Sequence, residues 1–118
     1  MTWIITADRP IYLQLVEQLE LAIVAGEYRA GGKLPSVRAA AGVNPNTMQR
    51  AMQELEARGL INTQRTAGRT ITEDETMIQA LRQQKAQEQI AQFWAAMQKL
   101  GFTQAEALSL LKQTKENA

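Results

Sequence analysis

The stretch of residues 42–60 constrains the fold of this chain most, because it carries the signals for both ends of one helix. Asn44 can accept a hydrogen bond from a free amide of the first helical turn. Pro45 suits the first helical position, since the N–H that proline lacks has no partner there in any helix. Gly59 is of the residue type that most often ends helices. The sequence therefore predicts a helix over about residues 45–58.

The two faces of this predicted helix differ in chemistry. One face follows the spacing of a buried apolar stripe, and the other carries hydrogen-bonding side chains at the same period. A helix that lies in the major groove of DNA needs such a polar face. An ordinary amphipathic helix with a solvated polar side has the same pattern, so the flanking sequence has to decide between the two. The apolar set is Val43, Met48, Ala51, Met52 and Leu55, and the polar set is Asn46, Gln49, Arg50 and Gln53.

The segment upstream predicts two more helices. The first has apolar residues at i, i+4 and i+8 over residues 11–23. The second begins near Pro35, which can occupy a first helical turn, and it is short because Gly42 turns the chain. Ser36 and Arg38 then fall near a helix N-terminus, which is a favourable site for an anion such as a phosphate.

The segment downstream changes from helical to strand periodicity. Residues 60–64 and 69–72 are rich in β-prone residue types and flank a short basic tip at residues 65–68, which predicts a hairpin. Residues 28–33 contain two adjacent glycines and predict a loop. Three helices followed by a two-stranded hairpin form a winged helix-turn-helix.

Positive charge is concentrated around the predicted winged helix-turn-helix. The whole chain has a formal net charge of only +1. Residues 1–27 carry one basic and four acidic side chains, which gives −3, and residues 70–118 carry five basic and six acidic ones, which gives −1. Residues 28–69 carry seven basic and two acidic side chains, which gives +5. Such a local excess is expected of a surface that binds phosphates.

Residues 73–118 predict two amphipathic helices. The first is expected over about residues 74–99, with acidic residues in its first turn, where they complement the helix dipole. Gly101 ends it. Thr103 and Glu106 have the spacing of a capping box, which opens the final helix.

Apolar side chains of these two helices form stripes that need a partner. In the first helix the stripe steps alternately by four and three residues, the spacing of a coiled coil. We expect the stripes to pack against a second copy of the chain, because this region is too small to enclose its own core. The alternative is that both helices fold back onto residues 11–23 of the same chain. The predicted interface residues are Ile90, Phe93, Trp94, Met97, Leu100, Leu108 and Leu111.

The composition argues against several classes of function. The chain has no histidine and no cysteine, so it lacks the commonest general base and the commonest zinc ligands. It also has no glycine-rich loop that could cradle a phosphate. No apolar run approaches the roughly 20 residues that span a membrane, and the N-terminus lacks a signal-peptide pattern. We expect a cytoplasmic protein with no catalytic activity, no cofactor and no metal site.

Several short motifs occur in a particular order along residues 9–72. Each motif is weak evidence alone, but their order and spacing together resemble the DNA-binding domain of the GntR family of bacterial transcription regulators. The short two-helix region that follows is similar to the YtrA-type branch, whose members lack larger effector domains and dimerise through this region. The motifs are Arg9-Pro10-Ile11-Tyr12 with Gln14, Leu34-Pro35-Ser36-Val37-Arg38, Val43-Asn44-Pro45-Asn46-Thr47, Glu54-Leu55-Glu56 with Gly59-Leu60-Ile61, and Arg65 with Gly68.

The resemblance implies which residues meet DNA. It places Arg38 against the operator, residues 44–47 with Gln49 and Arg50 in the recognition helix, and residues 65–68 at the tip of the wing. The predicted DNA-binding residues are Ser36, Arg38, Asn44, Pro45, Asn46, Thr47, Gln49, Arg50, Arg65, Thr66, Gly68 and Arg69.

The chemistry of these side chains fits that placement. Asn46 and Gln49 can read base edges, and Arg50 can contact a base or a phosphate. Arg65 and Arg69 can set the wing against the DNA backbone or the minor groove.

One departure from the family pattern lies just before the recognition helix. Only residues 39–41, all alanine, separate Arg38 from Gly42, whereas the family has about three residues more. If the second helix is simply shorter by three residues, Arg38 is rotated by about 60° about the helix axis and shifted by about 4.5 Å along it, relative to the recognition helix. The leucine that normally packs the second helix is also absent.

Taken together, the sequence predicts a mainly α chain with a small β-hairpin. Residues 1–72 are expected to form a winged helix-turn-helix DNA-binding domain, and residues 73–118 a helical dimerisation region. The leading hypothesis is a homodimeric repressor of transcription that binds a palindromic operator. The alternative is a dimeric protein-interaction module whose DNA binding is weakened by the shortened second helix. A small-molecule effector is possible but not indicated, although Phe93 and Trp94 could line a pocket rather than an interface.

Overall fold

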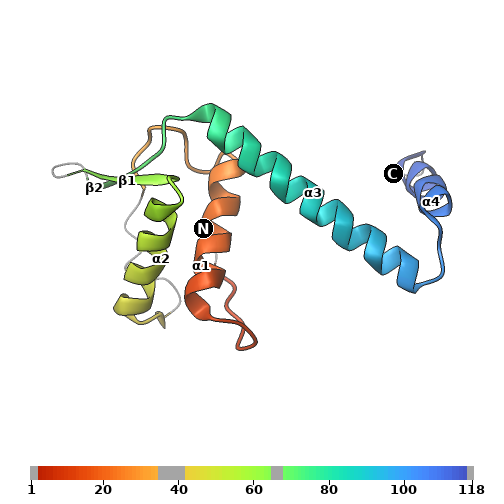
Figure 1. Ribbon diagram of the computed structural model, residues 1–118, viewed down its shortest axis with the longest axis horizontal. Coiled ribbons are helices and arrows are strands. Elements are labelled where there is room, and N and C mark those ends of the chain that lie inside the picture. The colour runs from red at the N-terminus through yellow and green to blue at the C-terminus, as the bar shows by residue number, and fades with distance from the viewer. Residues whose placement is uncertain (1–2, 35–41, 65–67, 117–118) are drawn as a thin grey trace. The chain divides into compact units, whose positions relative to one another are not determined.

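The computed structural model describes residues 3–34, 42–64 and 68–116 (Figure 1). Within these residues the chain is mainly helical and has one antiparallel hairpin, as the sequence predicts. The elements are α1 (Ile11–Val24), α2 (Pro45–Ala57), β1 (Ile61–Gln64), β2 (Gly68–Ile71), α3 (Glu75–Lys99) and α4 (Gln104–Glu116).

The chain divides into two compact units, Met1–Leu81 and Arg82–Ala118. The first two turns of α3 belong to the first unit, where Ile78 is buried and Met77 and Leu81 pack against its core. A boundary between DNA-binding and dimerisation regions at residue 73 remains a prediction.

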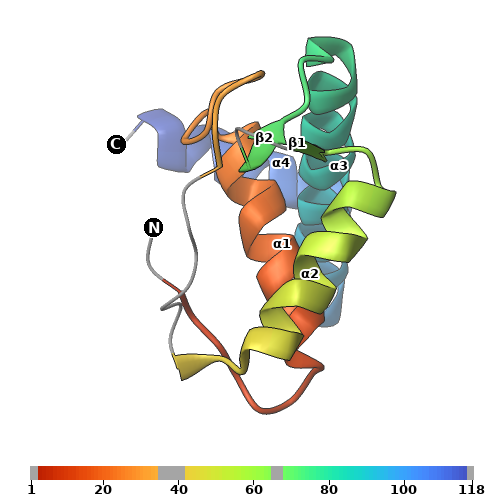
Figure 2. The same ribbon diagram turned by 90° about the vertical axis from the view of Figure 1, so that its left-hand side faces the viewer.

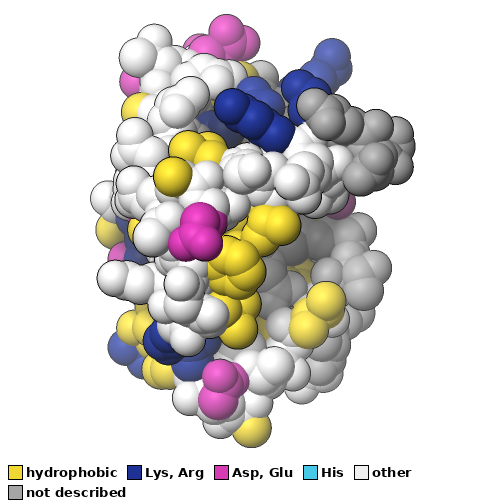
Figure 3. All heavy atoms as spheres, turned by 90° about the vertical axis from the view of Figure 1, so that its right-hand side faces the viewer, with side chains coloured by type: hydrophobic (Ala, Val, Ile, Leu, Met, Phe, Trp, Pro, Cys, Tyr) yellow, Lys and Arg dark blue, Asp and Glu magenta, His cyan; other side chains and the backbone are white. Residues whose placement is uncertain are grey.

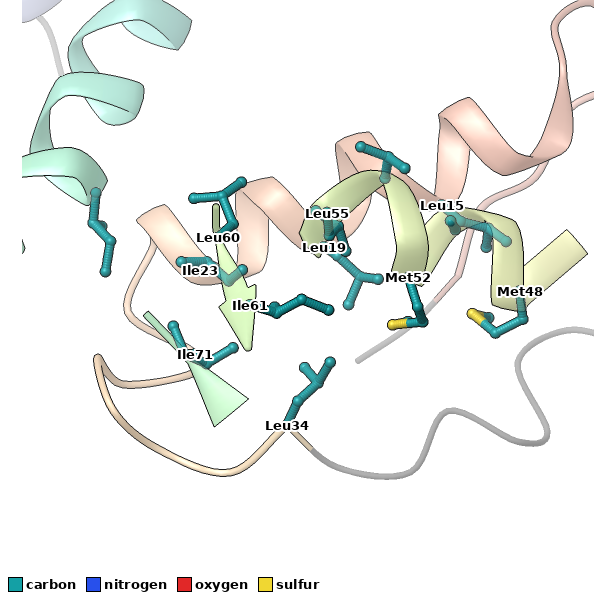
Figure 4. Close-up of a cluster of buried hydrophobic side chains, with 13 residues drawn as sticks. Leu15, Leu19, Ile23, Leu34, Met48, Met52, Leu55, Leu60, Ile61 and Ile71 are labelled. Atoms are coloured by element: carbon teal, nitrogen blue, oxygen red, sulfur yellow. The ribbon is translucent and has the colours of Figure 1, made fainter. Parts of the chain in front are cut away.

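The core of the first unit lies between α1 and α2, which run side by side with the hairpin across one end (Figures 1 and 2). The apolar stripes predicted for both helices face this core, and the hairpin and the loop before residue 35 close it (Figure 4). The seven largest fully buried side chains are Leu15, Val16, Leu19, Met52, Leu55, Ile61 and Ile71. Burial of these stripes fixes which face of α2 remains exposed.

An ion pair joins the end of α2 to α1. Arg58 donates to Glu54 at 3.0 Å and to Glu20, which is buried in α1, at 3.1 Å. The hydrogen bond to Glu54 is the largest cause of the raised pKa of the Arg58 guanidinium, and the contact with Glu20 raises it further. The sequence position of Arg58, at the end of the predicted helix, indicates only a helix-end charge or a solvated one. Its link to α1 shows that it also helps to hold the two helices together.

The hairpin is supported on its second side by the loop before it. β1 and β2 pair in antiparallel register, with Thr63 opposite Arg69. The N–H of Leu34 donates to the carbonyl of Arg69 at 2.9 Å, and the N–H of Ile71 donates to the carbonyl of Gly32 at 2.8 Å. The end of the predicted loop at residues 28–33 therefore runs along β2. The wing is fixed to the body of the first unit through backbone hydrogen bonds.

The N-terminal segment is also attached to α1 by side chains. The side chain of Gln14 is buried, accepts from the N–H of Thr6 and donates to two carbonyls, those of Thr6 and Arg9. Gln18 accepts from the N–H of Ile4 and donates to its carbonyl. Gln14, part of the family motif, therefore has a structural role here.

The second unit shows the capping box predicted from the sequence. The hydroxyl of Thr103 accepts from the N–H of Glu106, and the carboxylate of Glu106 accepts from the N–H of Thr103 at 3.0 Å. The backbone hydrogen bond is the largest cause of the lowered pKa of Glu106, whose ordinary value is 4.5. The start of α4 is thus defined by residues three positions apart.

We expect the start of α4 to loosen in acid. Because the pKa of Glu106 is lower in the folded chain than in the unfolded one, its stabilising contribution is complete above about pH 4.5 and is lost as the pH falls through the folded value. The amide resonance of Thr103, followed by NMR during a pH titration, should report this change. Glu106→Gln keeps the acceptor and should abolish the titration, whereas Glu88→Gln on α3 should leave it unchanged. A Thr103 amide that titrates equally in Glu106→Gln would contradict the assignment.

Candidate nucleic-acid interface

Helix α2 begins with the cap predicted from the sequence. The side-chain oxygen of Asn44 accepts a hydrogen bond from the N–H of Asn46 at 2.8 Å, and Pro45 occupies the first helical position. This cap satisfies one of the free amides of the first turn. Both Asn44 and Pro45 are exposed. They place the N-terminus of α2, with its remaining amides, at the surface of the first unit.

The exposed face of α2 carries the polar residues predicted to meet DNA. Asn46, Gln49 and Arg50 are exposed, and Thr47 is half-buried. The opposite face is buried in the core, which confirms the division of the helix into two faces. Amide, hydroxyl and guanidinium groups are therefore presented together over the first two turns. Donors and acceptors of this kind suit base edges and phosphates.

The guanidinium of Arg50 stacks on an aromatic ring from α1. Its central carbon lies 3.8 Å from the centre of the Tyr12 ring. A stacked guanidinium keeps its N–H donors at the edge of its plane, where they can still reach a ligand. From the sequence, Tyr12 belongs to the apolar stripe of residues 11–23 and to the first family motif, and neither predicts a contact with Arg50. The two residues line an open hollow of about 610 Å³ together with Pro10, Ile11, Asn46 and Thr47.

The amide of Gln49 is held by the wing. Arg69 in β2 donates through Nη2 to Oε1 of Gln49 at 3.0 Å. The sequence predicts that Arg69 sets the wing against DNA, which stays a prediction, and the structure brings its side chain against α2. The sequence offers no signal for this pair, because the two residues are 20 positions apart and in different elements.

The remaining predicted DNA-binding residues lie at the edge of the described chain or outside it. Gly68 opens β2 with a φ of 73°, a left-handed conformation that glycine adopts without strain. Ser36 and Arg38 of the predicted second helix, and Arg65 and Thr66 of the wing tip, lie outside the described residues. Their roles remain predictions.

The predicted interface residues lie on the second unit, where several large apolar side chains are open to solvent. Leu100 is 71% exposed, Ile90 52%, Leu108 48% and Leu111 45%. Figure 3 shows hydrophobic side chains that are open to solvent on one face of the molecule. Phe93 and Trp94 are half-buried and pack at a tilt, with ring centres 5.1 Å apart.

A small hollow lies where α3 meets α4. Its volume is about 150 Å³, and Trp94, Met97 and Phe102 form its apolar wall. Polar side chains of Gln98 and Gln104 complete it, together with Thr103 of the capping box. Trp94, one of the two aromatic residues for which a pocket is the alternative to an interface role, lines this hollow.

Two kinds of feature are absent from the residues that the structure describes. No helix there is both long enough and apolar enough to cross a membrane. No three acidic side chains in the same ranges gather in a way that could hold a metal ion.

The chain is similar in sequence and structure to known bacterial proteins. The model of a family described as bacterial regulatory proteins, gntR family, matches residues 11–71. The HTH-type transcriptional regulator YhcF of Bacillus subtilis is 38% identical over 109 residues, which is 90% of this chain and 90% of that protein. The HTH-type transcriptional repressor YtrA of the same organism is 41% identical over 71 residues, or 58% of this chain and 55% of that protein. A GntR family transcriptional regulator from Listeria monocytogenes has a TM-score of 0.81 at 38% identity, and the match covers 92% of this chain and 98% of that one.

Proposed function

The chain belongs to the GntR family of bacterial transcription regulators, and from this premise we propose that it is a repressor that binds a palindromic operator as a homodimer. The relatives it matches are transcriptional regulators, and GntR regulators bind DNA through a helix-turn-helix. Repression is supported by the name of the relative YtrA, which is a transcriptional repressor. Because operator DNA lies in the cytoplasm of a bacterium, the proposed function implies that compartment.

The exposed polar face of α2 is the observation that carries the proposal. Two of its long polar side chains are already supported by neighbours, Arg50 by Tyr12 and Gln49 by Arg69. Side chains held in one geometry lose less rotational freedom when a ligand binds. The polar side of an ordinary amphipathic helix needs no such support. The two pairs therefore favour a role of α2 in DNA recognition over a merely solvated helix face.

The side chains of this face suggest separate roles. Gln49 and Asn46 are proposed to read base edges, because amides offer both a donor and an acceptor to the major groove. Thr47 is proposed to bind a phosphate, and Arg50 a phosphate or a guanine. Ser36 and Arg38 are proposed to contact the operator, and Arg65, Thr66 and Gly68 to place the wing against the DNA backbone or the minor groove, as their sequence positions suggest.

Dimerisation is proposed to occur through the second unit. Four of the residues predicted for the interface, all large and apolar, are nearly half exposed or more, which supports the proposal. Such groups gain free energy when a second copy covers them, at roughly 25 cal/mol per Å² of apolar surface. Two recognition helices would then enter successive major grooves, with half-site centres about 34–36 Å apart.

A second candidate function is a protein-interaction module. The short segment between Arg38 and Gly42 favours it, since a displaced second helix would weaken DNA binding. An electrophoretic shift with the promoter region of the protein's own gene separates the two. Tight binding that depends on sequence and weakens with salt supports the regulator. Absence of binding at low salt supports the interaction module.

We expect removal of the Tyr12 ring to weaken DNA binding through Arg50. Tyr12→Leu should raise the dissociation constant by about two- to fivefold, which corresponds to about 0.5–1 kcal/mol for an exposed cation–π pair. Fluorescence anisotropy with labelled operator DNA measures this change. Tyr12→Phe keeps the ring and should bind like the wild type. If Tyr12→Leu weakens DNA binding by the same factor when Arg50 is already replaced by alanine, the effect does not pass through the stacked guanidinium and the proposed role of the stacking is wrong.

A further inference from the structure

The hydrogen bond between the wing and the recognition helix fixes which end of the Gln49 amide faces outward. A glutamine amide has an acceptor at one end and a donor at the other, and an unrestrained side chain can turn either end toward a ligand. Arginine has only donors. The group of Gln49 that lies 3.0 Å from Nη2 of Arg69 must therefore be the oxygen Oε1. The NH₂ group is left for other partners.

Arg69 is itself held in place, so it acts as a fixed donor. The backbone of Arg69 lies in β2 between two partners. Thr63 of β1 is paired with it on one side, and on the other side the N–H of Leu34 donates to the Arg69 carbonyl at 2.9 Å. The residue is half-buried and its Nε is fully buried, without a hydrogen-bond partner among the described residues. Such a side chain is less free to swing out to a phosphate than an arginine at the tip of a wing.

The charge of Arg69 also changes the chemistry of the amide. A hydrogen bond from a charged donor is about twice as strong as one between neutral groups. It draws electron density toward Oε1 and so strengthens the NH₂ group as a donor, as in other chains of hydrogen bonds. A second donor brought to Oε1, such as the N6 amino group of adenine, would meet the positive guanidinium nearby.

We propose that Arg69 is a positioning residue that makes Gln49 read DNA as a donor. Glutamine usually pairs with adenine, donating to N7 and accepting from N6. With Oε1 engaged by Arg69, Gln49 instead favours a base whose major-groove edge offers acceptors without a competing donor. Guanine offers N7 and O6, and thymine offers O4. The inference rests on the proposed function, since it assumes that α2 enters the major groove.

The competing role for Arg69 is a direct phosphate contact made by the wing. That role carries no base preference, because phosphates are the same in every sequence. Loss of the contact should weaken binding to all sequences alike and reduce the salt slope by about one. The two roles therefore differ in what they do to base preference.

The test is selection of bound sequences from a random DNA pool by the full-length protein, followed by binding measurements on the selected operator with each base at the Gln49 position. The wild type is expected to select guanine or thymine there. Arg69→Met should shift the preference toward adenine by about five- to tenfold. Arg69→Lys keeps a charged donor and should restore the wild-type preference. Arg82→Met, which removes an exposed arginine from α3, is the matched control and should change nothing.

A double variant shows whether Arg69 acts through Gln49. In a Gln49→Ala background, Arg69→Met should leave base preference unchanged. Thermal unfolding shows whether Arg69→Met folds. If it does not, Arg69→Gln gives the same test, because a glutamine amide can accept as well as donate and so does not fix which end of the Gln49 amide faces outward.

Three results would overturn the inference. Arg69→Met could weaken all sequences equally with the base preference intact, or its change in preference could persist in Gln49→Ala. A wild-type preference for adenine at this position would also contradict it. A wild type that selects no sequence at all would overturn the proposed function first, and this inference with it.

Discussion

Replacing Leu108 and Leu111 with glutamate should convert the protein from a dimer to a monomer and lower its affinity for a two-half-site operator by about 10²- to 10⁴-fold. Both side chains are nearly half exposed and lie three residues apart, on one face of α4. In a dimer the second half-site is bound intramolecularly, at an effective concentration in the range of about 1 mM. Two carboxylates on the proposed interface would remove that advantage, because burying an unpaired charge in the dimer costs several kcal/mol.

The control for this double variant adds the same charge to the same helix. Ser109→Glu with Gln113→Glu alters exposed positions on another face of α4 and should leave both dimerisation and DNA affinity nearly unchanged. Sedimentation velocity gives the oligomeric state, and anisotropy gives the affinity for one and for two half-sites. If the Leu108→Glu and Leu111→Glu protein remains a dimer, the second unit is not the interface.

Replacing Gln49 with alanine should lower the affinity for the preferred operator by about 1–3 kcal/mol, or about 5- to 150-fold. The loss should fall on one base pair in each half-site, because a side chain at one helical position reaches one base edge. Random DNA should lose much less, since its binding comes from phosphate contacts. Isotherms with operator and with random DNA at one salt concentration measure both effects.

Gln83→Ala is a matched control for Gln49→Ala. It removes an exposed glutamine from the part of α3 that belongs to the second unit, and it should bind like the wild type because Gln83 is not one of the predicted DNA-binding residues. Equal losses on operator and random DNA for Gln49→Ala would assign Gln49 to the backbone rather than to a base.

Local signals in the sequence predict the helix ends of this fold well. Asn44 and Pro45 define the start of α2, and Thr103 with Glu106 defines the start of α4, because each cap is made by residues within three positions of one another. The apolar period likewise identifies the buried face of α2, since that period follows from helix geometry alone. Once the buried face of α2 is known, the opposite face must point outward, and that face carries the candidate site.

Contacts between elements could not be predicted in the same way. The stacking of Arg50 on Tyr12 depends on how α1 crosses α2, and the bond from Arg69 to Gln49 depends on where the hairpin docks. The end of the loop before Pro35 pairs with β2 through backbone groups, which carry no sequence signature. Single-sequence periodicity describes one element at a time, so these tertiary contacts emerge only once the elements are packed.

Selection of bound sequences from a random DNA pool by the wild-type protein tests the central claim most directly. A homodimer with one recognition helix per protomer should enrich an inverted repeat whose half-site centres lie about one helical turn, or 10–10.5 base pairs, apart. Enrichment of that repeat, lost when Leu108 and Leu111 are replaced by glutamate, is the expected result. A pool that stays random after repeated rounds at low salt would contradict the assignment of this chain as an operator-binding dimer.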